Sequence, residues 1–250
     1  MRNDDLQLGF SERHRDVAFS VEGRAQKANK VLAVLEDYRG NLSSLTALDI
    51  GCSTGHTTRV YATRFKTVVG IDIDEPAIQY AARHSPTPNL QFHVMNSQHI
   101  TLPSNSFDVV ICNHIYEHVP DATTLLNEIH RLLKPNGICY FSAGNRLQLM
   151  EPHYRLPFLS VIPKPLAHLY LRAFGRGTYY YETHMTYWAL RRLVSRFELI
   201  DYTLRVVRRP EKFAANDVLR SGSTKQKLSL AVLTAAYWLC PTYLWVLKKS

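Results

Sequence analysis

The stretch ALDIGCSTGHTT, Ala47–Thr58, decides the fold of this chain together with VVGIDID at Val68–Asp74. A short apolar run enters a turn that contains Gly51 and Gly55, a helix is expected next, and a second apolar run ends near Asp72. Glycine lets the backbone turn tightly and approach a ligand closely. An acid at the end of such a strand can accept hydrogen bonds from two ribose hydroxyls. The pattern predicts a β–α–β unit that binds a nucleoside-like cofactor.

The glycine spacing separates two classes of cofactor. A dinucleotide fingerprint needs Gly at the first, third and sixth positions of G-x-G-x-x-G. Here those positions hold Gly51, Ser53 and His56. The spacing therefore disfavours an oxidoreductase that uses a dinucleotide.

Strands and helices alternate around this unit. Helices are expected over residues 24–38, from Asp74 onward, and over residues 121–133, where apolar residues recur at helical spacing. Strands are expected at residues 90–94, 107–112 and 138–142. This order predicts an α/β fold with a doubly wound, mostly parallel sheet.

The pattern changes after the fifth expected strand. Residues 146–185 carry four prolines and many aromatic residues, which predicts an insertion that forms a lid or a substrate wall. A helix over residues 186–196 and a strand over residues 199–207 (LIDYTLRVV) are expected to return to the sheet.

An uncharged run of twenty residues, Leu228–Leu247, lies near the C-terminus. Its length alone would allow a membrane span. Pro241 instead favours a helix that ends near Leu239, followed by a closing strand over residues 243–247. A helix lying on a membrane surface and a true span are the alternatives.

Composition predicts one globular domain over residues 1–250. Hydrophobic residues make up 46% of the chain and charged residues 20%. Residues 1–16 lack the apolar core of a signal peptide, so we expect a cytoplasmic protein. The four cysteines form no C-x-x-C pair, which favours buried thiols in a reducing compartment over metal ligands or disulfides.

The positive charge lies in the last third of the chain. Residues 160–250 hold 15 Lys or Arg against 5 Asp or Glu, whereas residues 1–159 hold 15 against 16. A basic face suggests an anionic substrate or surface, such as a phosphorylated metabolite, a nucleic acid or a phospholipid membrane. A peripheral position at the inner membrane face is therefore a second expectation for localisation.

The glycine turn resembles motif I of the class I S-adenosylmethionine-dependent methyltransferases, roughly D-x-G-x-G-x-G. Asp49, Gly51 and Gly55 match it, and Ser53 stands at the middle glycine. Three later segments resemble the family's adenine-binding loop with its fourth strand, the segment after that strand, and the turn before strand five. They are MNSQHITLPSNSFDVV (residues 95–110), NHIYEHV (residues 113–119) and LLKPNG (residues 132–137). The resemblance covers residues 40–145 and is closest to the quinone-biosynthesis and other small-molecule methyltransferases.

This resemblance implies a Rossmann-like fold of seven strands whose last strand is antiparallel. It divides the single domain into a core at 40–145, the insertion at 146–185 and a C-terminal part at 186–250. It also implies S-adenosyl-L-methionine as cofactor. The residues expected to bind it are Asp49, Gly51, Ser53, Gly55, Asp72, Ile73, Asn96, Ser97, Gln98 and Asn113.

The resemblance assigns roles within this set. Asp72 would accept the ribose hydroxyls, with a strand-end capping acid as the alternative. Asn96 stands where the family usually has an acid, and its carbonyl can still accept from the adenine amine.

Methyl transfer to an oxygen needs a base, and histidine has the most suitable pKa at neutral pH. The candidates are His114 and His118 after the fourth strand and His153 in EPHY. Glu117–His118 matches a pair seen in the quinone-type subgroup, which leaves a divalent-ion role open; a hydrogen-bonding role at a helix start is the alternative. We assign no metal site. Glu151 and Tyr154 would either position an acceptor or hold the lid.

The function predicted is methyl transfer to an oxygen of a small amphiphilic, lipid-linked or glycan acceptor, with an anionic membrane surface as a further partner. The alternatives are an RNA methyltransferase and a non-catalytic binding module. NHIY (residues 113–116) replaces the N-P-P-Y-like tetrapeptide of base-amino methyltransferases, which disfavours a nucleic acid partner. The intact pattern of Gly51, Gly55 and Asp72 disfavours a module without cofactor.

Overall fold

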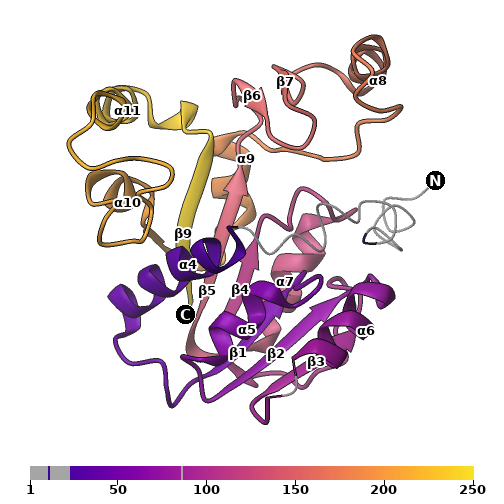
Figure 1. Ribbon diagram of the computed structural model, residues 1–250, viewed down its shortest axis with the longest axis vertical. Helices are drawn as coiled ribbons and strands as arrows, with labels where there is room; N and C mark the ends of the chain where they lie inside the picture. The colour runs from indigo at the N-terminus through magenta and orange to yellow at the C-terminus, as the bar shows by residue number, and fades with distance from the viewer. Residues whose placement is uncertain (1–10, 12–22, 86) are drawn as a thin grey trace.

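A computed structural model describes residue 11, residues 23–85 and residues 87–250. Within these residues seven strands form one sheet in the order β3-β2-β1-β4-β5-β9-β8 (Figure 1). The strands are β1 (Thr46–Ile50), β2 (Thr67–Asp72), β3 (Leu90–Val94), β4 (Phe107–Asn113), β5 (Leu133–Gly144), β8 (Phe197–Asp201) and β9 (Thr242–Lys249). Strands β1 to β5 pair in parallel, and β9 runs antiparallel to both β5 and β8. The predicted fold class is confirmed.

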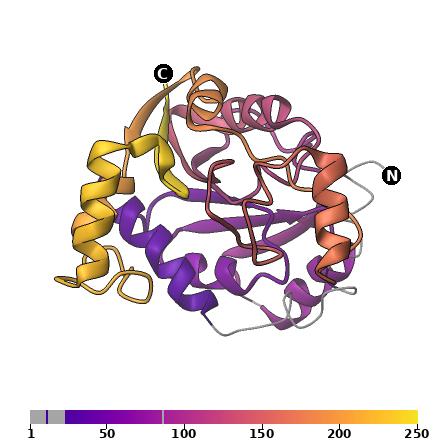
Figure 2. The same ribbon diagram turned by 90° about the horizontal axis from the view of Figure 1, so that it is seen from above.

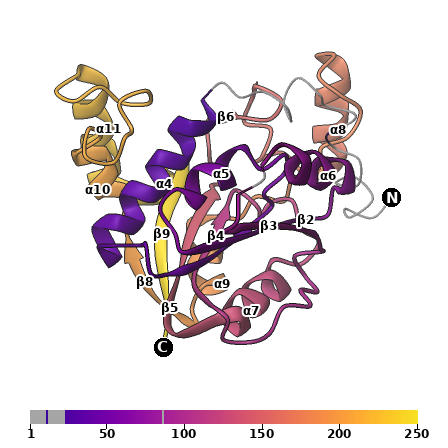
Figure 3. The same cartoon turned by 60° about the horizontal axis from the view of Figure 1, so that its bottom comes forward.

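Helices cover both faces of the sheet. They are α4 (Arg24–Arg39), α5 (His56–Ala62), α6 (Glu75–His84), α7 (Ala122–Leu132), α9 (Tyr187–Leu193), α10 (Thr203–Arg208) and α11 (Thr224–Ala235). Figure 3 shows α4, α5 and α6 on one face and α7 and α9 on the other. Val31 and Leu35 of α4 pack into one hydrophobic core, and Leu125 and Ile129 of α7 pack into the second. This double coverage is why β4 reads as a continuous apolar run.

The insertion after β5 has a small core of its own. It holds the hairpin strands β6 (Met150–Glu151) and β7 (Leu156–Pro157) and helix α8 (Lys164–Ala173). Leu156, Leu159 and Leu171 are buried together there. Figure 1 places these elements above the end of β5, and Figure 2 shows α8 and α11 on opposite sides of the molecule. The insertion therefore stands over the carboxyl edge of the sheet.

The C-terminal apolar run divides before Pro241, as predicted. Helix α11 ends at Ala235, a 3-10 turn η1 spans Tyr237–Leu239, and β9 follows. Over the described residues, no helix combines the length and apolarity needed to cross a bilayer. The four cysteines are free and buried, as expected.

One predicted strand is too long. The strand expected over residues 199–207 ends at Asp201, and α10 begins at Thr203. The Asp201 carboxylate accepts a hydrogen bond from the Thr203 amide at 2.8 Å and a second from the Tyr237 hydroxyl. A side chain that bonds to the backbone two residues on favours a turn over a continuing strand, so the chain leaves the sheet here.

Asn145 joins the end of β5 to the C-terminal segment. Its side chain is buried, and Nδ2 donates to the carbonyls of Trp238 at 2.8 Å and Cys240 at 2.9 Å. We expect Asn145→Ala to lower the free energy of unfolding by about 2–4 kcal/mol, because the buried Cys240 carbonyl loses this donor and the Leu147 amide loses its bond to Oδ1. Urea unfolding measures the change. The exposed Asn127, which contacts Arg196, is the control; its Ala variant should stay within about 0.5 kcal/mol of the parent. If Asn145→Ala changes the free energy of unfolding as little as the Asn127 variant does, Asn145 does not stabilise the junction between β5 and the C-terminal segment.

Candidate functional site

A cavity of about 1730 Å³ opens at the carboxyl ends of the parallel strands. Ligand pockets usually measure about 300–1,000 Å³, so this one has room for a cofactor and an acceptor together. It collects most of the candidates from β1, β2 and β4, from the loops after them, from the loop after β3 and from the insertion after β5. These are Asp49, Gly51, Ser53, Asp72, Ile73, Asn96, Ser97, Asn113, His114, His118 and His153.

The turn after β1 is shaped by left-handed residues. Gly51 has φ of 73°, and a Cβ there would lie 2.2 Å from Cδ1 of Ile115. Ser53 adopts the left-handed region with φ of 49°, the conformation that the family's glycine favours. The Ser53 amide donates to Asp72 Oδ2 at 2.7 Å. The turn is thus tied to the end of β2.

Two expected cofactor residues lie away from the cavity wall. A Cβ on Gly55 would lie 2.6 Å from Cζ of Phe92 and 2.9 Å from Cβ of Ala81, so this glycine permits packing between α5, β3 and α6. The Gln98 side chain donates to the carbonyl of Asp121 at 3.0 Å. The described structure therefore gives both residues packing or loop contacts.

Asp49 is buried at the end of β1. Its Oδ2 accepts a hydrogen bond from the Thr58 hydroxyl at 2.7 Å. Burial raises the pKa of the Asp49 carboxyl to about 7, the Thr58 hydrogen bond lowers it, and the neighbouring Asp72 raises it further. Burial also raises the pKa of Asp72, against the hydrogen bonds from the amides of Asp74 and Ser53. Two neighbouring carboxyls with raised pKa values favour a positively charged ligand.

Asp49 predicts a pH dependence of stability. The folded pKa of about 7 lies above the unfolded value of about 3.9, so folding favours the protonated acid. The stability contribution of this proton is complete below about pH 4 and is lost as the pH rises through 7. We expect Asp49→Asn to remove this fall in the free energy of unfolding between pH 4 and 7. Urea unfolding across that range measures it, and an unchanged pH profile in the variant would contradict the prediction.

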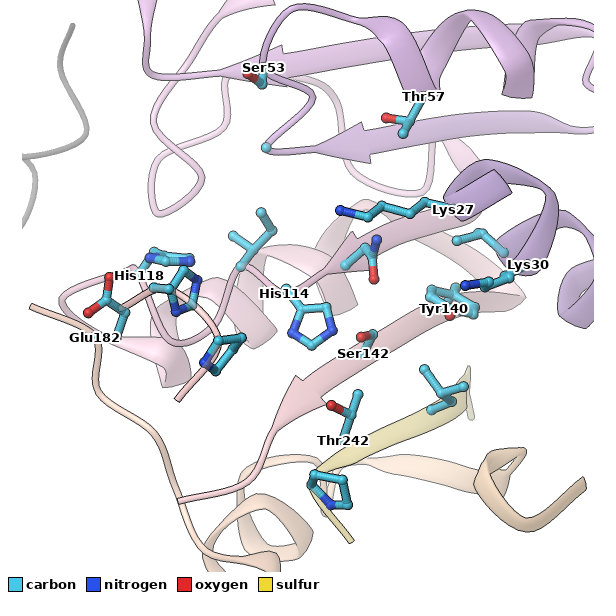
Figure 4. A pocket seen from close by; sticks show the side chains of 18 of the residues that line it. Lys27, Lys30, Ser53, Thr57, His114, His118, Tyr140, Ser142, Glu182 and Thr242 are labelled. Atoms are coloured by element: carbon cyan, nitrogen blue, oxygen red, sulfur yellow. The ribbon is translucent and has the colours of Figure 1, made fainter. Parts of the chain in front are cut away.

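His114 projects into the middle of the cavity (Figure 4). Its backbone is left-handed, with φ of 58°, immediately after β4. Its Nδ1 donates to Oε1 of the buried Glu117 at 3.1 Å. Burial alone would raise the pKa of Glu117, but the hydrogen bond from His114 and the nearby His118 lower it to about 2. An ionised Glu117 fixes the imidazole so that Nε2 remains available to the cavity.

A second group of titratable side chains lies at one end of the cavity. His153 Nδ1 donates to Oε1 of the buried Glu151 at 2.6 Å, and the rings of His153 and His118 are 5.0 Å apart. Burial lowers the pKa of His118 to about 4. Glu182 and His184 join this group from the segment before α9. Sequence reasoning missed both, although the run YETH (residues 181–184) carries them two residues apart.

A cationic wall on α4 was also missed. Lys27 and Lys30 line the cavity opposite the insertion, and Figure 4 shows both side chains extending from α4. Lys30 pairs with Asp217 at 2.6 Å. The pKa of Lys27 is lowered by burial and by the charges of Arg24 and Lys30. An anionic group on a ligand would relieve this repulsion.

Comparison with known proteins matches the segment that carries the glycine turn and the first parallel strands. Residues 48–141 match a family described as methyltransferase domain. The ubiquinone biosynthesis O-methyltransferase of Pseudomonas syringae pv. tomato is 34% identical over 114 residues, which are 44% of this chain and 49% of that protein. The chain thus spans about half the length of the curated relatives it matches.

Solved structures agree over most of the chain. The S-adenosylmethionine-dependent methyltransferase from Mesorhizobium loti superposes with a TM-score of 0.59 at 16% identity, covering 92% of this chain and 100% of that one. The N-methyltransferase NodS from Bradyrhizobium japonicum, in complex with S-adenosyl-L-homocysteine, superposes with a TM-score of 0.52 at 13% identity, covering 89% and 85%. At these identities the likeness establishes the fold.

Proposed function

We propose that this chain, a class I methyltransferase by its segment at residues 48–141 and by its sheet, transfers a methyl group from S-adenosyl-L-methionine to an oxygen of a small acceptor. The observation that carries the proposal is one cavity in which a glycine turn, the buried Asp49, the half-buried Asp72 and a fixed imidazole meet. The turn and the acids suit the binding of a positively charged nucleoside. The imidazole suits the removal of a proton from the acceptor.

The residues at the ends of β1 and β2 fit the cofactor. The left-handed backbone at Gly51 and Ser53 turns the chain sharply after β1, and both residues line the cavity. Asp72 uses one lone pair of each oxygen on the amides of Ser53 and Asp74, and each oxygen keeps another for a ribose hydroxyl. Asp49 would stabilise the ligand's positive charge. Asn96 and Ser97 line the wall where the adenine is expected.

S-adenosyl-L-methionine, when bound, supplies an electrophilic methyl group on a sulfonium. His114 is the base we propose, because its Nδ1 is held by Glu117 and its Nε2 can accept the acceptor's proton. Glu117 stabilises the imidazolium that results, since the carboxylate is buried and ionised beside it. The cavity walls hold the acceptor oxygen in line for displacement.

The walls of the cavity define a class of acceptor. Lys27 and Lys30 on α4 offer a cationic contact. Leu228 and Val232 of α11 add apolar surface to the same cavity, and both are exposed. Cationic and apolar contacts together favour an amphiphilic acceptor with an anionic group. The ubiquinone biosynthesis enzymes among the relatives support a lipid-linked acceptor of this kind.

Calorimetric titration with S-adenosyl-L-methionine and S-adenosyl-L-homocysteine tests the proposal. We expect binding of both at micromolar concentrations, followed by transfer of labelled methyl to an acceptor in a screen of quinone precursors, anionic lipids and glycan intermediates. If neither compound binds, the proposal that this chain is an enzyme is overturned, and a non-catalytic binding module becomes the leading function. If the cofactor binds but labelled methyl is transferred only to RNA, the proposal of a small-molecule acceptor is overturned.

A further inference from the structure

Five metal-ligating side chains from three separate segments meet at one end of the cavity. They form two overlapping sets, His118–His153–Glu182 and Glu151–His153–His184, and within each set the ligand atoms lie within 4.8 Å of one another. His118, His153 and Glu182 line the cavity, whereas Glu151 and His184 are not among its lining residues. Figure 4 shows His118 and Glu182 side by side, at the far end from Lys30. We call His118, His153 and Glu182 the inner group; Glu151 and His184 lie behind it, away from the cavity.

Backbone contacts hold the segment of Glu182 against the loop after β4. The Thr183 amide donates to the carbonyl of Glu117 at 2.8 Å, and the Met185 amide donates to the Tyr116 hydroxyl at 3.0 Å. Glu182 therefore lies beside His118 because the chain immediately after it is bonded to the two residues before His118.

One of the two histidines of the inner group, His153, is oriented by a carboxylate behind it. Glu151 is fully buried, accepts the Nδ1 hydrogen bond of His153 at 2.6 Å, and accepts a second bond from the Tyr154 amide at 2.9 Å. This leaves Nε2 as the free ring nitrogen of His153. A carboxylate that fixes one imidazole nitrogen while the other binds a metal is the usual arrangement around zinc ligands.

One carboxylate oxygen of Glu182 is buried without a hydrogen-bond partner among the described residues. This oxygen is Oε2, and the Glu182 side chain is 93% buried. A buried carboxylate oxygen without a partner is costly, and such groups in folded proteins are normally satisfied. A dication between Glu182, His153 and His118 would satisfy it.

We propose that His118, His153 and Glu182 bind one Zn²⁺ ion, with Glu151 as the positioning residue behind His153. Two imidazoles and one carboxylate suit zinc, whereas Mg²⁺ and Ca²⁺ prefer oxygen ligands alone. Three protein ligands leave a fourth position open, and because all three line the cavity this position faces the space that the proposed function assigns to the acceptor. The ion would also fasten the insertion to the loop after β4, because it joins ligands from both.

Zinc binding to the full chain tests the site without cofactor or acceptor, so its outcome is independent of methyl transfer. The protein is stripped with a chelator, titrated with Zn²⁺ in a calorimeter, and analysed for bound metal after dialysis. We expect one equivalent per chain and, with Co²⁺ in its place, the visible spectrum of a tetrahedral site. Less than half an equivalent of zinc would overturn the proposal.

Variants then identify the ligands. His153→Ala and Glu182→Gln should abolish stoichiometric binding, and Glu151→Gln should weaken it about 10- to 100-fold. His99→Ala, at an exposed histidine outside the cavity, is the matched control and should bind zinc like the parent. Circular dichroism confirms that each variant is folded; if one is not, His118→Ala takes its place. Parental affinity in the folded ligand variants would refute the assignment.

Discussion

The variant His114→Asn is expected to lower kcat by about 10²- to 10⁴-fold, the usual contribution of a positioned base. Asparagine tolerates the left-handed backbone that His114 adopts, with φ of 58°, so the loop should keep its course. The measurement is turnover with the acceptor found by the screen, together with the dissociation constant of S-adenosyl-L-methionine. We expect the dissociation constant to stay within about twofold of the parent, because the Asn side chain changes the acceptor side of the cavity.

The exposed His99 provides the control for this experiment, since His99→Ala removes an imidazole outside the cavity. Glu117→Gln should also lower kcat, because a neutral amide no longer stabilises the imidazolium of His114. Parental kcat in His114→Asn would show that the acceptor oxygen loses its proton to another group.

The variant Asp72→Asn is expected to weaken binding of S-adenosyl-L-methionine by about 10- to 150-fold, or about 1.5–3 kcal/mol. The amide would face the backbone amides of Ser53 and Asp74 with at least one donor, and it would lose the charge that strengthens the ribose hydrogen bonds. Calorimetric titration measures the change directly.

Asp108 is the matched control, because it lies near the start of β4, at the opposite edge of the sheet from Asp72. Its carboxylate likewise bonds a backbone amide, that of Thr46 at 2.9 Å, and pairs with Lys134 at 2.8 Å. Asp108→Asn should lower stability without changing cofactor affinity. Equal losses of affinity in both variants would mean that the Asp72 effect is a general loss of folded structure.

Sequence reasoning placed most of the sheet correctly, because local signals and burial agree there. The boundaries of β3 and the buried stripe of α7 follow from apolar periodicity, and the break before β9 follows from Pro241. The strand expected over residues 199–207 was wrong because apolar composition did not reveal the turn at Asp201.

The sequence by itself determined the β–α–β unit, the break before β9 and the acids at the ends of β1 and β2, whereas the antiparallel closure was expected only from the family resemblance. These depend on residues close together in the chain or on the common edge at which parallel strands end. Only the tertiary structure decided that Glu182 meets His118 and His153, and that Lys27 faces the same cavity. Such contacts join residues far apart in sequence, and their distances are set by how the insertion and α4 pack on the sheet, which no local pattern encodes.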